Sequence, residues 1–162
     1  MPKRSAETRS REAYEKLAGN MTLVGVFLGG VTLDVCREAF PENAEARASH
    51  KVRGKTEVDG MSGYLRAVCS FSLSSRAQGQ RKPYQKTQAC FDVVFDAESG
   101  ELSQEMAAML GRDAVQVCWP YLRELVDTLS FRAAVPIPTL PFLTDEVLES
   151  VLSEQKASRS DG

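Results

Sequence analysis

The sequence predicts an α+β fold: a four-stranded antiparallel sheet followed by two main helices packed on one of its faces. Between residues 21 and 96, apolar and polar residues alternate, which is the period of strands with one apolar face. From Leu102 onward the apolar residues recur at the period of an α-helix. The loops between the predicted strands are too short for helical crossovers, so a meander, in which each strand pairs with the next, is the simplest topology.

The first predicted strand spans residues 22–36, and Gly29-Gly30 in its middle predicts a bend or a bulge. We expect one face of this strand to carry Leu23, Phe27, Val31, Leu33 and Val35. The second predicted strand spans residues 51–58 and ends at a tight turn at Asp59-Gly60.

The third (64–74) and fourth (87–96) predicted strands alternate strictly. The residues that we expect to face the core are Leu65, Ala67, Cys69, Phe71, Leu73, Ala89, Phe91, Val93 and Phe95.

The helical pattern predicts a short helix at residues 103–110, which ends at Gly111, and a longer one at residues 113–133. The longer helix contains Pro120 between two aromatic residues. A proline inside a helix removes a backbone hydrogen bond and destabilises the helix by about 3 kcal/mol. We therefore expect Pro120 either to pack against another element or to produce a kink. The apolar stripe of this helix is wider than one sheet face needs, and burial against a second subunit would explain it. We therefore predict helix-packing and oligomer contacts at Trp119, Pro120, Tyr121, Leu122, Leu125 and Val126.

The segment 135–143 is rich in proline and is expected to be extended, because a residue before proline avoids the α region. Thr144 can cap a last helix, with acidic residues in its first turn. Apolar residues of this region are candidates for a groove that binds polypeptides: Ile137, Leu140, Phe142, Leu143, Val147 and Leu148. Alternatively, they simply close the core.

The two ends of the chain are polar. We expect residues 1–19 to form a flexible N-terminal tail or a marginal helix, residues 20–156 a single domain, and residues 157–162 a disordered tail.

The composition is that of an ordinary globular protein, with 43% hydrophobic and 26% charged residues and a net charge of −2. This charge gives no global basic field, so we expect no nucleic-acid partner; the basic residues of the N-terminus are interspersed with glutamates. There is no apolar run long enough for membrane insertion and no apolar segment at signal-peptide spacing, so we expect a cytoplasmic protein.

The residue types suited to catalysis are sparse. The four cysteines form no CxxC motif and His50 is the only histidine, so we expect no metal site and no cofactor. No phosphate-binding loop, dinucleotide fingerprint or nucleophile elbow occurs. The sequence is therefore not expected to be that of an enzyme.

Short segments of the chain carry a family resemblance. The strongest is the series Met106-Ala107, Leu110-Gly111, Pro120-Tyr121 and Arg123-Glu124. It is followed by Val135-Pro136, Leu140-Pro141 and Asp145, and preceded by Val26-Phe27, Val31-Thr32-Leu33-Asp34 and Pro41. In this order and spacing, residues 22–155 resemble the SecB family of bacterial export chaperones.

The resemblance implies a homotetramer, built as a dimer of dimers with helices between subunits. It also implies an ATP-independent holdase that binds unfolded or precursor polypeptides in apolar grooves and passes them to the export motor SecA. Asp34 and Asp92 match acidic positions of the family that receive the motor. The chain departs from the family at Gly29-Gly30, where an acid is expected, and at the second strand, whose outer face is basic (Lys51, Arg53, Lys55).

Two other functions stay open at this point. One is a dedicated SecB-like chaperone for a single partner, such as the antitoxin of a toxin–antitoxin pair. The other is a non-catalytic oligomeric scaffold, as a dimer or a tetramer, whose grooves are filled by its own side chains.

Overall fold

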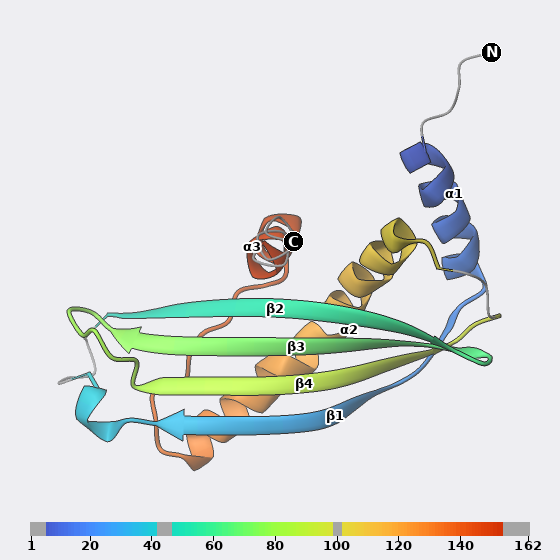
Figure 1. The fold of residues 1–162 in the computed structure, drawn as a ribbon. Coiled ribbons are helices and arrows are strands. Elements are labelled where there is room, and N and C mark those ends of the chain that lie inside the picture. The colour runs from blue at the N-terminus through green and yellow to red at the C-terminus, as the bar shows by residue number, and fades with distance from the viewer. Residues whose placement is uncertain (1–5, 42–46, 99–101, 154–162) are drawn as a thin grey trace, which may run out of the picture.

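The computed structural model of the chain describes residues 6–41, 47–98 and 102–153 (Figure 1). The predicted C-terminal tail and the first five residues of the predicted N-terminal segment lie outside these residues. The elements in chain order are α1 (Ala6–Gly19), β1 (Thr22–Val35), the 3-10 turn η1 (Arg37–Ala39), β2 (Ala48–Met61), β3 (Tyr64–Ala77), β4 (Gln85–Asp96), α2 (Gln104–Arg132) and α3 (Asp145–Leu152).

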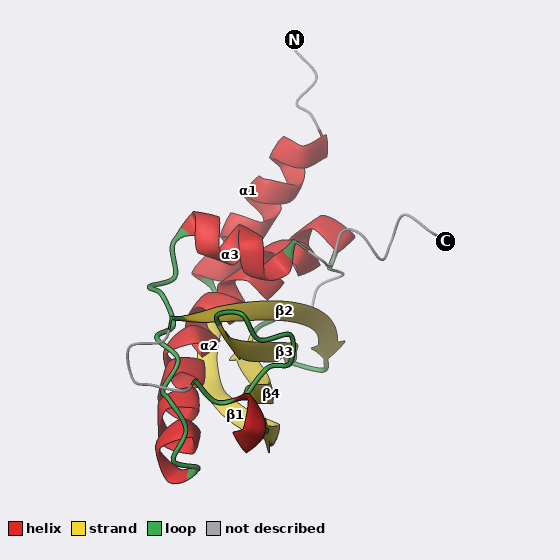
Figure 2. Cartoon of the chain, turned by 90° about the vertical axis from the view of Figure 1, so that its left-hand side faces the viewer, coloured by secondary structure: helices red, strands yellow, loops and turns green. Residues whose placement is uncertain are grey.

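The predicted α+β architecture is confirmed. The four strands form one antiparallel sheet, α2 crosses one face of it diagonally, and α3 lies beside β2 (Figures 1 and 2). The opposite face of the sheet, here called the outer face, carries none of the described helices (Figure 2).

The strand order is β1-β4-β3-β2. The predicted meander is correct for β2, β3 and β4 but wrong for β1, which pairs with β4 at the far edge of the sheet. Adjacent strands are about 4.8 Å apart, so the chain between residues 35 and 48 is long enough to pass the ends of the two central strands. Both β1 and β2 are consequently edge strands.

Two register shifts interrupt β1, one between Leu23 and Gly25 and one between Leu28 and Gly30. The second confirms the bulge that Gly29-Gly30 predicts, whereas the first was not predicted. Each bulge inverts the alternation of side chains. Between the bulges, Leu28 therefore lies opposite the inward residue Phe91, and Phe27 lies opposite Asp92 on the outer face. The prediction that Phe27 shares a face with Leu23 and Val31 is wrong for this reason.

The turn between β2 and β3 lies later than expected. Asp59 and Gly60 continue the ladder opposite Arg66 and Leu65, so the predicted turn at Asp59-Gly60 is wrong. The chain turns at residues 62–63, where Gly63 has a φ of 78°, a conformation that glycine adopts without a steric penalty.

One continuous helix, α2, replaces the two that were predicted. Ser103 caps it by accepting a hydrogen bond from the Met106 N–H at 3.1 Å. Gly111 does not end the helix; it lies where α2 crosses β2, and a Cβ there would come within 2.5 Å of the Thr56 Oγ1. Glycine is needed for this close approach. Pro120 lies inside the helix and is exposed.

The core lies between the sheet and α2. All nine residues predicted to face inward from β3 and β4 are buried, as are seven residues of α2: Leu110, Ala114, Val115, Cys118, Trp119, Leu122 and Val126. Of the two alternatives predicted for residues 1–19, the structure has a 14-residue helix over Ala6–Gly19. Tyr14 anchors this helix, because its ring is buried and its hydroxyl donates a hydrogen bond to Asp113 of α2.

Candidate functional site

A groove of about 670 Å³ runs between the edge strand β2 and the two C-terminal helices. We call it the edge groove; it is lined by Thr56, Glu57, Val58, Asp59, Gln104, Ala107, Ala108, Arg112, Glu149 and Leu152. The sequence prediction placed none of its groove residues here. The edge groove could not be predicted from the sequence, because it depends on β2 being an edge strand and on α2 packing against that strand.

Close contacts between helices and β2 set the shape of the edge groove. Gly54 lies where α3 approaches the strand, and a Cβ there would come within 2.6 Å of Val151 Cγ1. The Arg112 guanidinium forms an ion pair with Glu149, which joins α2 to α3. Because β2 is an edge strand, an extended polypeptide could pair with its backbone without regard to side-chain sequence. The alanines of α2 leave room for such a segment.

The six predicted groove residues divide into exposed and buried groups. Phe142 is 79% exposed and Ile137 is 49% exposed, whereas Leu143 and Val147 are half-buried. Leu140 and Leu148 are buried in the core of the chain itself. The Arg123 guanidinium lies 5.0 Å from the centre of the Phe142 ring, so the extended segment follows α2.

The predicted helix-packing residues divide in the same way. Trp119 is buried, its ring lies edge-on to Phe71 at 6.3 Å, and its indole N–H donates to the Pro141 carbonyl at 3.0 Å. Leu122 and Val126 are also buried by the chain's own sheet, and Leu125 is half-buried. The predicted stripe is thus mostly covered within one protomer, so it gives no independent argument for a second subunit.

Large apolar side chains of α2 remain uncovered on its other side. Tyr121 is exposed and Phe131 is 77% exposed, while Pro120 lies between the buried Trp119 and the exposed Tyr121. We call the exposed residues Tyr121, Phe131, Ile137 and Phe142 the helix-side apolar set.

The edge strand β1 also exposes apolar side chains, among them Leu23, Phe27 and Val31 of the predicted apolar face. Five of its residues are between 38% and 53% exposed: Leu23, Val24, Phe27, Leu28 and Val31. Both faces of the strand contribute, since Phe27 lies on the outer face whereas Leu23, Leu28 and Val31 lie on the helix side.

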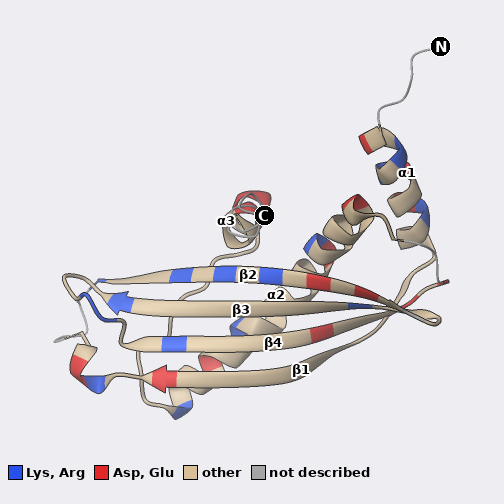
Figure 3. Ribbon diagram, in the orientation of Figure 1, with Lys and Arg blue, Asp and Glu red and all other residues tan. Residues whose placement is uncertain are grey.

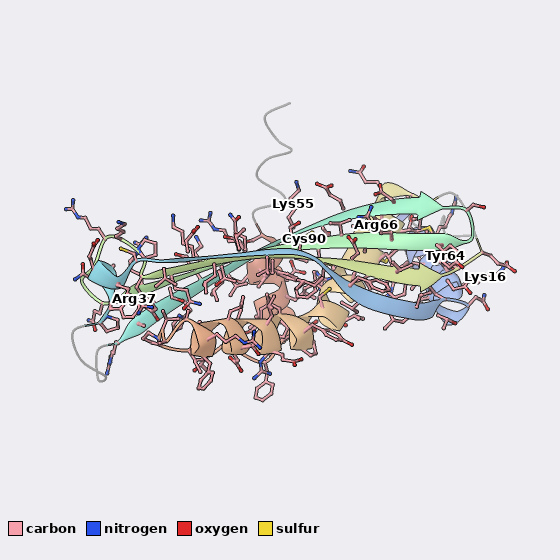
Figure 4. All side chains as sticks on the ribbon, turned by 90° about the horizontal axis from the view of Figure 1, so that it is seen from below. Lys16, Arg37, Lys55, Tyr64, Arg66 and Cys90 are labelled. Carbon is pink, nitrogen blue, oxygen red and sulfur yellow. The ribbon has the colours of Figure 1, made fainter. Side chains whose placement is uncertain are left out.

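The outer face of the sheet has a different chemistry. A hollow of about 630 Å³ spans all four strands there, with Lys55 and Cys90 on the side of the sheet away from α2 (Figure 4). Of the two predicted motor-docking acids, Asp34 is exposed and lies opposite Lys86. Asp92 is half-buried, and one Arg66 nitrogen donates to both of its oxygens at 3.0 and 3.1 Å.

The perturbed titratable groups are explained by packing. A hydrogen bond with Cys118, burial and nearby negative charge raise the pKa of the Cys69 thiol, which keeps it protonated. Burial lowers the pKa of His50, whose Nδ1 lies 2.9 Å from the Ser75 hydroxyl.

Within residues 6–41, 47–98 and 102–153, no group of three or more aspartate, glutamate, histidine or cysteine side chains lies close enough together to hold a metal ion. None of the helices in this part of the chain has the length and apolar character to cross a membrane.

A solved structure of another protein has the same fold over most of this chain. It is the SecB-like chaperone Rv1957 of Mycobacterium tuberculosis in complex with a ChAD peptide from the Rv1956 HigA1 antitoxin. It is 24% identical, with a TM-score of 0.66, over 83% of this chain and 99% of that chain. A protein of unknown function from Streptococcus agalactiae is 13% identical, with a TM-score of 0.40, over 75% of this chain and 97% of that chain. No protein-family model matches the sequence, and no curated protein matches it significantly.

Proposed function

We propose that this chain, which has the fold of the SecB-like chaperones, binds non-native polypeptides through apolar surface and needs no nucleotide to do so. The observation that supports this most directly is the helix-side apolar set, four large side chains left in solvent on that fold. Exposed apolar patches on globular proteins generally mark binding sites for other proteins. Burial of apolar surface contributes about 25 cal/mol per Å² without directional demands, so one surface can hold many unfolded sequences.

Two surfaces would share this work. The helix-side apolar set supplies large apolar contacts, whereas Leu143 and Val147 are half-buried and pack against the core. The edge groove supplies the backbone of an edge strand, with which an extended client segment could pair. Leu140 and Leu148 act as core residues in this proposal, because they are already packed inside the chain.

We further propose that copies of the chain associate, as a dimer or a tetramer, through β1. β1 is an edge strand with unpaired backbone groups and five partly exposed apolar residues, so it can pair with a strand of another chain. A second copy of this chain would bury these apolar residues. The variant Leu28→Lys should therefore give a smaller particle by light scattering at micromolar concentration. An unchanged mass would contradict association through β1.

A narrower function has its own support. The Mycobacterium tuberculosis protein was solved with a ChAD peptide of an antitoxin, so a dedicated chaperone for one such partner is the second candidate. Delivery to SecA has less support, because Arg66 holds Asp92 and Lys86 lies opposite Asp34, which reduces the acidity of the surface. The proposal includes action in the cytoplasm and no catalytic step.

Suppression of aggregation tests the proposal. An unfolded client is diluted from denaturant with and without the protein, and light scattering is followed in the absence of nucleotide. The parent should suppress scattering, and the double variant Ile137→Ser with Phe142→Ser should do so less well. Tyr64→Ser is the control, since Tyr64 is also a large exposed apolar residue, about as exposed as Ile137, but lies on the outer face.

The outcomes separate the candidates. Suppression for several unrelated clients supports a general holdase, and suppression for one client only supports a dedicated chaperone. If the parent suppresses no client, or if the double variant and the Tyr64→Ser control behave alike, the helix-side apolar set is not the binding surface.

A further inference from the structure

One end of the sheet, where β2 begins and β3 ends, carries a group of exposed basic side chains. They come from η1, from the residue before β2, from the end of β3 and from the loop between β3 and β4. We call this group the basic end; it consists of Arg37, Arg47, Arg76, Arg81 and Lys82. Figure 3 shows basic residues gathered at this end, and Figure 4 shows Arg37 at the opposite end of the sheet from Lys16 and Tyr64.

Backbone hydrogen bonds hold these separate segments side by side. The Gln78 N–H donates to the Arg47 carbonyl at 2.8 Å, which joins the start of the loop between β3 and β4 to the residue before β2. The Cys36 N–H donates to the Tyr84 carbonyl at 2.9 Å, which places η1 beside the other end of the same loop. The basic end is therefore one continuous surface although its residues are far apart in the sequence.

The basic end has little compensating charge. Within the described residues 36–41, 47–49 and 76–84, Glu38 is the one carboxylate. Behind it, Asp34 lies opposite Lys86 in the strand register, so these two residues together add no net charge. In the part of the chain that the structure describes, no carboxylate forms an ion pair with Arg81 or Lys82. The whole chain carries −2, so the charge of the remaining residues is negative and the molecule is polarised.

We propose that the basic end attaches the protein to the surface of an anionic lipid bilayer, without insertion of any segment. Each lysine or arginine near such a surface strengthens binding about fivefold. The five cations lie at one end of the sheet, so they can approach a plane of lipid headgroups together, and their long side chains can adapt to it.

The shape of the molecule keeps opposing charge away from the bilayer. β3 has 14 residues, so at about 3.3 Å per residue the sheet is about 45 Å long. Acidic residues such as Asp59 and Asp96 lie at its other end. This distance is several times the Debye length of about 8 Å at physiological ionic strength, so these acids are screened from the lipid headgroups.

The side chains at this end favour a bilayer over other anionic partners. Single-stranded nucleic acids bind where exposed aromatic side chains offer stacking surfaces beside basic residues. The aromatic residues here are Phe40 and Tyr84, whose ring centres are 5.8 Å apart; Phe40 is half-buried and Tyr84 is buried. An acidic peptide would need a groove, and the hollow of about 410 Å³ nearest to this end has Arg76 as its one residue from the basic end.

Vesicle flotation tests the proposal with the full-length protein. The vesicles contain phosphatidylcholine with phosphatidylserine as about a third of the lipid. The parent should float with these vesicles and remain behind with vesicles of phosphatidylcholine alone. In about 1 M salt, where the Debye length falls to about 3 Å, the binding should be lost.

Variants locate the attachment site. The double variant Arg81→Gln with Lys82→Gln should weaken binding to the anionic vesicles about tenfold or more. The control variant Arg9→Gln with Lys16→Gln removes the same charge from the exposed surface of α1 and should bind as the parent does. Both variants should still suppress client aggregation, so failure of this proposal is distinguishable from failure of the proposed chaperone function. Circular dichroism checks that both variants fold.

Three results would overturn the proposal: no binding of the folded parent to anionic vesicles, equal loss in both double variants, or tighter binding of another anionic polymer at the same residues. Single-stranded oligo(dT) and a glutamate-rich peptide are the probes for the third result. Either one, if it displaced the protein from vesicles and lost affinity in the Arg81→Gln, Lys82→Gln variant, would show that the basic end serves that class of partner instead.

Discussion

The contact between Gly54 and α3 gives a sharp test of how the edge groove is built. The variant Gly54→Ala would place a Cβ 2.6 Å from Val151 Cγ1. An ordinary carbon–carbon contact is about 3.5–4.0 Å, so the side chain of Val151 must move by about 1 Å or α3 must shift. Overpacking of this kind costs about 1–3 kcal/mol.

A double-mutant cycle isolates this clash. The variant Val151→Ala removes the Cγ1 atom and should cost about 2 kcal/mol on its own, because the side chain is buried. In the combined variant the new Cβ meets no Cγ1, so the total cost should be less than the sum of the two single costs. A coupling of about 1–3 kcal/mol is expected from residues in direct contact.

Urea unfolding at one fixed protein concentration measures these free energies. Gly60→Ala is the control on the same strand, since a Cβ there would meet only Leu65 Cδ2, at 4.0 Å. Its stability should be unchanged or slightly raised. If Gly54→Ala is as stable as this control, or if the two costs simply add, α3 does not pack on β2 as described.

Three further predictions follow from buried or paired side chains. Trp119→Ala should lower the free energy of unfolding by about 3–5 kcal/mol in urea titrations, and Trp119→Phe, which keeps a ring but loses the bond to Pro141, should cost less. Should the chain bind SecA, as the family resemblance implies, Asp34→Asn with Asp92→Asn should fold normally and lower that affinity in a binding titration; an unchanged affinity would end the docking role that the resemblance implies for them. Burial lowers the pKa of His50, so the unfolded chain binds the proton more readily and stability should fall with pH below about 6.5. Between about pH 7.5 and 5.5, the parent should therefore lose more stability than His50→Gln, and equal losses would show that this histidine does not couple to folding.

The central sheet and the last helix could be predicted from the sequence because their signals are local. β3 and β4 alternate without a bulge, so the inward residues follow from counting alone. Thr144 caps α3 as predicted, accepting from the Val147 N–H at 3.3 Å. Local patterns of this kind do not depend on which elements become neighbours.

The predictions that were wrong concern features that depend on tertiary contacts. Two bulges invert the faces of β1, which no count of alternation detects without the partner strand. A glycine such as Gly111 often marks the end of a helix. Here it instead allows α2 to pass close to Thr56 of β2. The hollow on the outer face depends on which small residues of β3 lie opposite which residues of β2, and strand register is not visible in the sequence.

For two of the predicted groove residues, Ile137 and Leu140, the sequence pattern also predicts which is buried. In an extended segment successive side chains point to opposite sides. Leu140 is buried and Ile137 is exposed, in agreement with this period of two along residues 137–140. The same period would bury Phe142, which is 79% exposed, so the alternation sorts Ile137 and Leu140 but not the candidates after Pro141.

The central claim, that the protein holds non-native polypeptides through apolar surface, is tested most directly by complex formation. The purified protein is incubated without nucleotide with a reduced, permanently unfolded client and analysed by size-exclusion chromatography with light scattering. We predict a soluble complex of defined mass that contains both proteins and that forms less with Ile137→Ser and Phe142→Ser together. A well-folded protein that elutes alone, with each of several clients, would contradict the account.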